Sequence, residues 1–248
     1  MPVAAISDIH SNLPALQAVL ADIEARGINE IWCLGDVLGY GADPDECAEL
    51  ISERCRPCLV GNHDLAVLGA LDIGSFSEAA AEAVVWTREN ASERTLDFLR
   101  ELEPIGLRRG IALFHASPRD PVWEYVLSLE QAHACLEAQP ERITLIGHSH
   151  VSLFFALPEG GSFADTVGGQ AGDGSRLELA DGGRWLINPG SVGQPRDGDP
   201  RAAWLELDPE GQAAVFHRCA YDIDRAAAAI AAHPELPKRL ADRLYVGQ

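Results

Sequence analysis

The stretch Val3-Ala4-Ala5-Ile6-Ser7-Asp8-Ile9-His10 carries the first apolar run of the chain and ends it in polar side chains. Its first four residues are apolar and partly β-branched, which indicates a buried strand. Asp8 and His10 follow two positions apart, and in extended backbone such residues point to the same face. A carboxylate and an imidazole on one face are two ligands for a divalent metal such as Zn, Mn or Fe. Two ligands do not complete a site, so the later strand ends have to supply the others.

The composition favours one large α/β domain in a reducing compartment. The chain has 248 residues, of which 47% are hydrophobic, and this is enough to bury a sizeable core. No stretch approaches the ~20 apolar residues of a membrane span, and we expect no signal peptide at the N-terminus. Six cysteines are spread along the chain. Cys55 and Cys58 have C-x-x-C spacing without a second pair, so reduced thiols and a cytoplasmic location are expected.

The charge excludes broad contact with polyanions. The formal net charge is −19, because 19 Lys and Arg residues stand against 38 acidic residues. Long nucleic acids and anionic membranes are bound through many Lys and Arg side chains, so neither is an expected partner. A small phosphorylated ligand stays compatible with this charge if metal ions reverse the sign locally.

The first 150 residues alternate between strand and helix. Helical spacing or capping signals predict helices from Leu13 toward Gly27, from Asp43-Pro44 to about Glu53, over 77–102 with a break near 90–92, and from Ser128 to about Ala138. Apolar runs predict strands at 3–6, 30–34, 58–60, 111–114 and 143–146. This alternation predicts a largely parallel sheet with helices packed on it.

The pattern changes after residue 150. Short strands joined by turns are predicted at 151–157, 176–179, 184–187, 202–207 and 213–217, with a turn at Asp181-Gly182-Gly183. Residues 158–175 are rich in Gly and lack periodicity, so we expect a mobile surface loop there. Two short helices are expected at 221–232 and 235–245. We predict a single domain, 1–248, with two sheets.

Each of the five N-terminal strands ends in side chains that can bind metal. These are Asp8 and His10, then Asp36, then Asn62, His63 and Asp64, then His115, and finally His148 and His150. Ligands of open α/β sheets gather outside the carboxyl ends of the strands. Five of the eight histidines lie at such ends, whereas His133, His217 and His233 have no such context.

In this order the motifs resemble the calcineurin-like metallophosphoesterases, specifically their small bacterial and archaeal phosphodiesterase branch. The family's motifs D-x-H, G-D, G-N-H-D/E, a lone His and G-H-x-H stand here as Asp8-Ile9-His10, Gly35-Asp36, Gly61-Asn62-His63-Asp64, His115 and Gly147-His148-Ser149-His150. The resemblance covers 3–150 and extends through the turn 188–193. It implies a four-layer α/β/β/α sandwich, in which two mixed sheets are flanked by helices.

The resemblance also implies two divalent metal ions. Asp8, His10, Asp36 and His150 would hold one, and Asp36, Asn62, His115 and His148 the other, so that Asp36 bridges them. Such a pair clamps a phosphoryl group and activates a bridging hydroxide as nucleophile. Mixed N and O ligands accept Mn, Fe, Zn, Co or Ni, and we expect Mn. His63 would stabilise or protonate the leaving group, with Asp64 fixing its tautomer.

The residues that contact substrate are less defined. Protein phosphatases of this superfamily follow the second motif with Asp-Arg-Gly, and this chain lacks that arginine, which disfavours a phosphoprotein substrate. Arg119 and Arg196 are candidates for binding phosphate, although each could be a solvated surface arginine. Tyr40, together with Trp123 and Tyr125, could stack on a nucleobase or pack in the core. Asn12 is either a substrate contact or a helix N-cap.

We therefore expect a metal-dependent phosphodiesterase that hydrolyses small phosphodiesters or nucleotides. The alternative is a dinucleoside polyphosphate hydrolase of the diadenosine tetraphosphate type. A catalytically inactive metal-binding scaffold is the third hypothesis, and it is disfavoured because all seven ligands and His63 are present. The expected partner is a small-molecule phosphoester, and homo-oligomerisation stays open.

Overall fold

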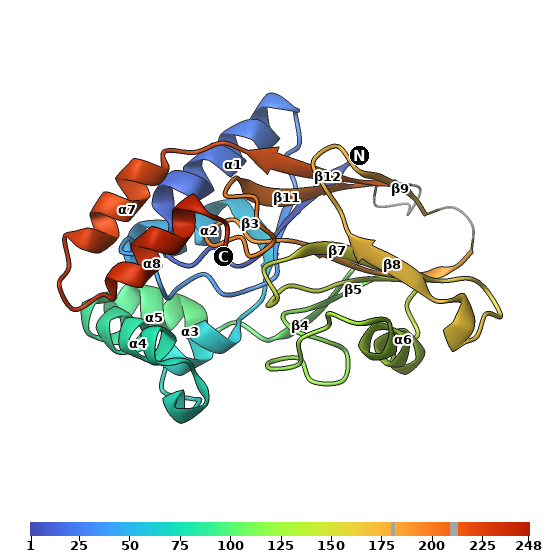
Figure 1. Ribbon diagram of the computed structural model, residues 1–248, viewed down its shortest axis with the longest axis horizontal. Coiled ribbons are helices and arrows are strands. Elements are labelled where there is room, and N and C mark those ends of the chain that lie inside the picture. The colour runs from blue at the N-terminus through green and yellow to red at the C-terminus, as the bar shows by residue number, and fades with distance from the viewer. Residues whose placement is uncertain (180–181, 209–212) are drawn as a thin grey trace.

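Two six-stranded sheets form the centre of the protein (Figure 1). The computed structural model describes residues 1–179, 182–208 and 213–248. Sheet A has, in spatial order, β3 (Cys55–Cys58), β2 (Ile31–Cys33), β1 (Val3–Ile6), β11 (Ala202–Leu207), β12 (Ala213–Cys219) and β9 (Arg176–Glu178). Sheet B has β4 (Ile105–Arg108), β5 (Ile111–Phe114), β6 (Ile143–Leu145), β10 (Arg184–Pro189), β7 (Ser152–Leu157) and β8 (Val167–Gln170).

Both sheets are mixed, which confirms the two mixed sheets that the resemblance implies. The largely parallel sheet predicted from the alternation in the first 150 residues is instead divided between them. β1, β2 and β3 are parallel in sheet A, whereas β5 and β6 are parallel in sheet B. Strands from the C-terminal half complete each sheet: β11 pairs antiparallel with β1, and β10 pairs parallel with β6 and antiparallel with β7. Because each sheet needs strands from both halves of the sequence, we propose that 1–248 is one domain.

Alternating side chains build the four layers. In β1, Val3 and Ala5 point into the core between the sheets, whereas Ala4 and Ile6 point to the outer face of sheet A. α1 (Leu13–Ala25) and α2 (Pro44–Arg54) cover that face. In β5 the alternation puts Ala112 and Phe114 on the outer face of sheet B, under α6 (Leu129–Ala138). The predicted α/β/β/α sandwich is confirmed, with α1 above sheet A and α6 below sheet B in Figure 1.

Further helices pack at the end of the sheets where the site lies. α4 (Glu78–Asn90) and α5 (Glu93–Arg100) are separated at Ser92, whose side chain accepts from Thr95 N, so the predicted break is confirmed. α7 (Ile223–Ala231) and α8 (Lys238–Asp242) pack with α4 in one apolar cluster that includes Tyr40. Single 3-10 turns lie at Ile73–Ser75, Phe163–Asp165 and Arg243–Tyr245.

Some elements differ from those that the sequence predicts. The third strand is Cys55–Cys58 rather than 58–60, and both β4 and the short helix α3 (Asn62–Val67) were not predicted. The expected loop at 158–175 contains β8, which pairs with β7. The glycines of this segment suggested a loop, but Gly168 is needed for strand pairing. A Cβ at Gly168 would lie 2.3 Å from the Phe154 carbonyl oxygen, so β8 can approach the backbone of β7 only with glycine at this position. Asp181 of the predicted 181–183 turn lies outside the described residues.

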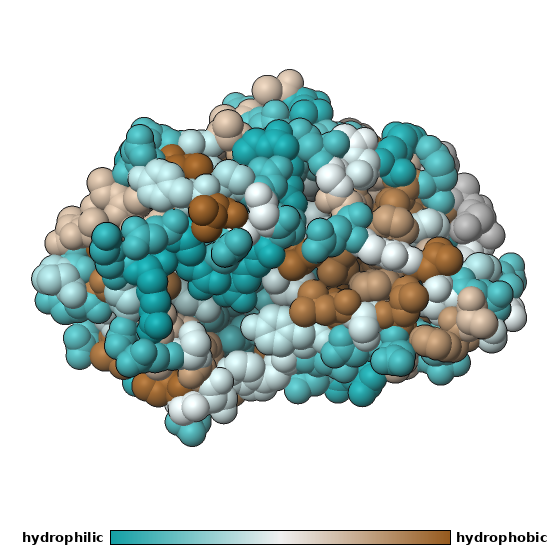
Figure 2. Space-filling view, in the orientation of Figure 1, coloured by the Kyte–Doolittle hydropathy of each residue, from teal (hydrophilic) through white to brown (hydrophobic). Residues whose placement is uncertain are grey.

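Hydrophobic surface is unevenly distributed on the face drawn in Figure 2. Brown side chains gather around β7 and β8, whereas the region nearer the C-terminal helices is mostly hydrophilic. Exposed apolar residues on sheet B and its neighbouring segments include Leu107, Leu127, Phe163 and Val167. Within the described residues, no helix has the length and apolar character needed to cross a membrane.

Trp204 on β11 tests the packing of α1 on sheet A. Its ring is fully buried, and its Nε1 donates to Asp22 Oδ2 on α1 at 3.0 Å. We expect Trp204→Ala to lower the free energy of unfolding by about 3–5 kcal/mol, because the substitution leaves a cavity in the core. It also removes one of the hydrogen bonds to Asp22 Oδ2, which still accepts from Arg26 Nε at 3.1 Å. Urea denaturation with EDTA present would measure this without a contribution from bound metal.

The matched control is Phe163→Ala, since Phe163 is 48% exposed. Its cost should stay below about 1 kcal/mol. Equal losses for the two variants would contradict the packing described here.

Candidate metal centre

The loops that follow β1, β2, β5 and β6 meet at one edge of the two sheets, together with the N-terminus of α3. All seven predicted metal ligands lie in these segments, and each side chain is buried: Asp8, His10, Asp36, Asn62, His115, His148 and His150. Burial of so many polar groups in one place requires partners for them.

The seven residues form two groups that share Asp36. One ligand atom from each of Asp8, His10, Asp36 and His150 lies within 4.8 Å of the others. Asp36, His115 and His148 form a second group by the same measure. Asn62 Oδ1 lies 3.1 Å from His115 Nε2 and so borders the second group. The structure therefore brings together the residues of both expected metal sites.

The backbone at this edge is not extended. Asp8, His10, Asp36, His148 and His150 have φ values of 55°, 49°, 52°, 64° and 60°. These φ values lie in the left-handed region of backbone conformation. This conformation costs L residues free energy and is often found at functional sites. The prediction that Asp8 and His10 share a face of an extended strand is thus wrong, since tightly wound loops bring both ligands together.

Both aspartates present one free oxygen to the cluster. Asp8 Oδ2 accepts from His148 N at 3.1 Å, and Asp36 Oδ1 accepts from His63 N at 2.9 Å. The other oxygens, Asp8 Oδ1 and Asp36 Oδ2, are buried and have no hydrogen bond to any of the described residues. A buried carboxylate oxygen without a donor is costly, and a cation would satisfy it.

Backbone carbonyls orient the imidazoles. Nδ1 of His10, His115 and His150 lies 3.0, 2.9 and 2.6 Å from a carbonyl oxygen, those of Leu38, Leu34 and Gln194 respectively. If each Nδ1 donates, each Nε2 presents a lone pair to the cluster. His148 is turned the other way, because its Nε2 lies 3.2 Å from the Trp123 carbonyl oxygen.

His10 and His150 show why this arrangement suits a cation. Their Nε2 atoms are 3.0 Å apart, although each Nδ1 is held by a carbonyl oxygen. Two lone pairs at this distance repel each other, and an ion coordinated by both removes the repulsion. His150 Nε2 is also 3.4 Å from Asp8 Oδ1. A mixed N and O donor set of this kind fits first-row divalent metals.

The pKa shifts of the candidate ligands also favour bound cations. Burial raises the pKa of Asp8 to about 7, and burial followed by the charge of Asp64 raises the pKa of Asp36 well above its usual value. Burial is likewise the largest cause that lowers the pKa values of His10, His148 and His150. The site alone thus disfavours charged side chains, and divalent cations would stabilise the two carboxylates in their ionised form.

His63 and Asp64 lie at the start of α3 but do not interact through their side chains. The His63 ring packs against His10 and Tyr40, with centroids 4.8 and 4.4 Å away. Its Nδ1 has no hydrogen-bond partner among the residues that the structure describes. The prediction that Asp64 fixes the tautomer of His63 is therefore wrong.

Asp64 has a structural task instead. Its Oδ1 accepts from Leu38 N at 2.9 Å, and its Oδ2 accepts from Val37 N and Gly61 N at 3.1 and 3.0 Å. The Leu38 carbonyl in turn orients His10. Asp64 thus holds the loop that positions a candidate metal ligand.

Two of the four predicted substrate contacts have other roles. Asn12 is the N-cap of α1: its Oδ1 accepts from Ala15 N, and its Nδ2 donates to the Gly193 carbonyl and to the Tyr221 hydroxyl. These bonds support the N-cap alternative and leave Asn12 little capacity to bind substrate. Arg119 is exposed, and its guanidinium lies 3.5 Å from Glu124 Oε1, as expected for a solvated surface arginine.

Tyr40 and Arg196 lie beside the cluster. The Tyr40 ring is 4.6 Å from that of His10, and its hydroxyl accepts from Arg196 Nη2 at 3.1 Å. Trp123 packs on Phe76 at 5.0 Å, and Tyr125 is half-exposed with its ring 4.1 Å from His148. Of these three aromatic residues, Tyr125 has the largest surface available for stacking.

Sequence reasoning missed the residues that act through their carbonyl groups, namely Leu34, Leu38, Trp123 and Gln194. A carbonyl is present at every residue, so side-chain identity gives no signal for this role. The turn 188–193 was a partial signal. Asn188 Nδ2 donates to the Gly147 carbonyl, and Ser191 Oγ donates to the Asp8 carbonyl, so this turn fastens two ligand loops to each other.

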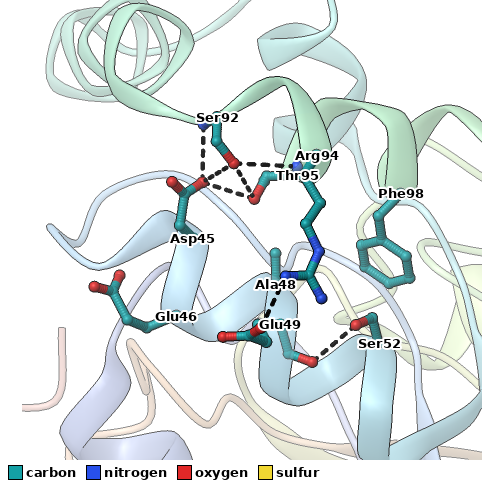
Figure 3. Close-up of a pocket in the computed structure, with 9 residues that line it drawn as sticks. All are labelled: Asp45, Glu46, Ala48, Glu49, Ser52, Ser92, Arg94, Thr95 and Phe98. Atoms are coloured by element: carbon teal, nitrogen blue, oxygen red, sulfur yellow. Dashed lines mark hydrogen bonds and ion pairs between the residues drawn. The ribbon is translucent and has the colours of Figure 1, made fainter.

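A groove of about 240 Å³ between α2 and α5 lies apart from the cluster (Figure 3). Its polar groups bond to one another: Asp45 Oδ1 accepts from Ser92 N, Ser92 Oγ and Thr95 Oγ1, and Arg94 pairs with Glu49 at 3.0 Å. These contacts cap α5 and join the two helices, so the polar groups that bond here have a structural role.

We predict that Asp36→Asn abolishes binding of both metal ions, because the variant replaces the single carboxylate common to the two groups with a neutral amide. The wild-type protein loaded with Mn²⁺ should retain about two ions per chain after desalting. Metal analysis by mass spectrometry measures the loss. Asp97→Asn, at an exposed position on α5, is the control and should bind like the wild type. Retention of both ions by Asp36→Asn would remove Asp36 as the shared ligand.

Comparisons with known proteins agree with this geometry. The calcineurin-like phosphoesterase superfamily domain matches residues 1–210. An uncharacterised protein of Methanocaldococcus jannaschii is 38% identical over 99% of this chain and 98% of its own length. The crystal structure of a metallophosphoesterase from Sphaerobacter thermophilus has a TM-score of 0.89 and 37% identity, covering 100% of this chain and 99% of that one.

A hypothetical protein from Pyrococcus horikoshii shares the fold at a TM-score of 0.78 and 19% identity, over 100% of this chain and 98% of its own. The family match over residues 1–210 and the 38% identity to the Methanocaldococcus jannaschii protein over 99% of the chain together establish the family. The chain belongs to the calcineurin-like phosphoesterase superfamily.

Proposed function

We propose that the protein is a dinuclear metal-dependent phosphodiesterase that hydrolyses small phosphodiesters or nucleotides. One observation carries this proposal. Asp36 Oδ2, which has no hydrogen bond, lies 3.6 Å from His10 Nε2 in one group and 3.6 Å from His115 Nε2 in the other. A single carboxylate oxygen placed equally between two sets of nitrogen ligands is what a bridge between two cations requires.

The residues present fit two divalent ions. Asp8, His10 and His150 would hold the first ion, Asn62, His115 and His148 would hold the second, and Asp36 would bridge them. When bound, such ions polarise the phosphoryl oxygens and lower the pKa of water so that it can act as the nucleophile. The donor set accepts Mn, Fe, Zn, Co or Ni, and we propose Mn. The neutral amide of Asn62 limits the negative charge that a phosphate would meet.

His63 is the residue that we assign to the leaving group. Its ring packs on His10, and its Nδ1 has no hydrogen-bond partner within the described residues. Burial, and next the charge of Arg196, lower the pKa of His63 well below the usual value. A neutral imidazole still carries one N–H, so His63 can donate a hydrogen bond to the oxygen that leaves phosphorus. This supports stabilisation rather than full protonation of the leaving group.

The chemistry of the chain favours a small substrate. The net charge of −19 opposes long polyanions, whereas the metal ions would attract a single phosphate group locally. The inactive scaffold is disfavoured, since every candidate ligand lies in the cluster.

All six cysteines are free thiols, which supports a cytoplasmic location.

We expect His63→Ala to keep both metal ions and to lose roughly 10²–10⁴-fold in kcat, the usual contribution of a group that acts on the leaving oxygen. The assay is hydrolysis of bis(4-nitrophenyl) phosphate by the Mn-loaded protein, with metal content measured on the same preparation. The wild-type protein should turn over this diester and should lose activity when EDTA removes the ions.

His133→Ala is the control, because His133 lies on α6 outside the cluster. It should react at the wild-type rate. Normal turnover by His63→Ala with intact metal would exclude His63 from the mechanism. Failure of the wild-type protein with two bound ions to hydrolyse any of a panel of diesters and nucleotides would support the scaffold hypothesis instead.

A further inference from the structure

The segment 116–126 connects the two histidines of the proposed second metal group. It begins directly after His115, which follows β5, and it ends shortly before α6. At its far end the segment returns to His148: the Trp123 carbonyl oxygen lies 3.2 Å from His148 Nε2, and the Tyr125 ring lies 4.1 Å from the His148 ring. Residues 116–126, all within the part of the chain that the structure describes, contain neither helix nor strand. Other hydrogen bonds therefore have to fix the shape of this segment.

The contact with Trp123 decides which ring nitrogen of His148 is free to bind metal. A carbonyl oxygen can only accept, so His148 Nε2 carries the hydrogen and Nδ1 carries the lone pair. Histidines that bind metal commonly donate their other N–H to a fixed acceptor, which sets the tautomer and the orientation of the ring. The position of the Trp123 peptide therefore controls how His148 presents its lone pair to the group that it forms with Asp36 and His115.

Glu124 lies between the two residues that touch His148, and its carboxylate fixes this end of the segment. The side chain is half-buried, and its Oε2 accepts from Ser117 Oγ and, at 3.7 Å, from Cys135 Sγ on α6. Its Oε1 lies 3.5 Å from the Arg119 guanidinium. One carboxylate thus ties the end of the segment to its beginning and to the helix that follows.

Ser117 is the other half of this connection. Its hydroxyl is buried and accepts from the backbone N–H groups of Arg119 and Asp120 at 3.1 and 3.0 Å. A hydroxyl has a single hydrogen to donate, and Ser117 donates it to Glu124. Because Ser117 stands two residues after His115, this one hydrogen bond joins the part of the segment next to His115 to the part that holds His148.

We propose that Glu124, through its bond to Ser117, is a positioning residue for the second metal ion. It lies outside both groups of candidate ligands and acts by holding the Trp123 carbonyl where His148 can donate to it. A carboxylate suits this task, since a hydroxyl that donates to an ionised acceptor forms a short, strong bond. The inference rests on the proposed function, because it concerns the same dinuclear site.

The effect should be confined to one of the two ions. The imidazoles of the first group depend on other acceptors, since the carbonyl oxygens of Leu38 and Gln194 orient His10 and His150. Glu124 has no printed bond to either carbonyl's residue, and its partners all lie in 117–135. Loss of its carboxylate should therefore loosen His148 and leave the first group in place.

The test is a titration of the metal-free protein with Mn²⁺, followed by calorimetry and by electron paramagnetic resonance. We expect Glu124→Ala to weaken binding of one ion by about 10- to 100-fold, the usual effect of removing a group that orients a metal ligand. Binding of the other ion should weaken by less than about threefold. Two adjacent Mn²⁺ ions give a spin-coupled spectrum, so in this variant the coupled spectrum should appear only at higher Mn²⁺ concentrations.

Nitrogen NMR of the imidazoles in the Zn-loaded protein identifies the affected ion. The wild-type protein should show the ring hydrogen of His148 on Nε2 and those of His10 and His150 on Nδ1. In Glu124→Ala the His148 signal should be lost or averaged between tautomers, whereas the other two should keep their positions.

Three variants separate positioning from a general loss of stability. Glu124→Gln keeps an oxygen that accepts from Ser117 and should bind both ions within about threefold of the wild type. Ser117→Ala should weaken the same ion as Glu124→Ala, and the double variant should lose little more, because both substitutions remove one contact. Glu130→Ala, at an exposed position on α6, is the matched control and should change neither ion.

The outcomes distinguish this inference from the proposed function. Equal weakening of both ions, unchanged binding in Glu124→Ala and Ser117→Ala, or losses that add in the double variant would overturn the role of Glu124. Hydrolysis of diesters by the wild type would still support the phosphodiesterase in each of these cases. Selective weakening of one ion in a protein whose wild type hydrolyses no ester would keep the role of Glu124 and reject the proposed function.

Discussion

The carboxylate of Asp36 is the point on which the arrangement of the site depends. One of its oxygens is fixed by the His63 N–H at 2.9 Å, and the other is left free between His10 and His115. The residue adopts a left-handed conformation, and a Cβ at Gly61 would lie 2.0 Å from Asp36 Oδ1. Gly61 is therefore required so that the loops after β2 and β3 can approach each other. The left-handed backbone and the burial of the Asp36 carboxylate both cost free energy, and a pair of bound cations would compensate for that cost.

Hydrogen bonds from the neighbouring loops position the other candidate ligands around the Asp36 carboxylate. Asp64 holds Val37 and Leu38 through their N–H groups, and the Leu38 carbonyl orients His10. On the opposite side, the 188–193 turn fastens the loops after β1 and β6, and Gln194 beyond it orients His150. Strands from both sheets thus contribute to one cluster, which explains why the family fold places its two sheets face to face with their loops at a common edge.

Much of this could be predicted from the sequence because strand ends and ligand-type side chains coincide. Most helices and most strands follow from apolar periodicity and from caps such as Ser92. What could not be predicted depends on contacts between distant residues: the division of the parallel strands between two sheets, the pairing of β8 with β7, and the left-handed φ of Asp8 and His10. Asp64 was misread for the same reason, since its partner Leu38 lies far away in sequence. The N-cap alternative for Asn12 could be stated because its partner Ala15 lies only three residues away.

Anomalous diffraction from crystals grown with Mn²⁺ tests the central claim most directly. The account predicts two manganese peaks about 3.5–4 Å apart, with Asp36 Oδ2 between them, Asp8, His10 and His150 around one, and Asn62, His115 and His148 around the other. A single peak, or two peaks that do not share Asp36, would contradict it.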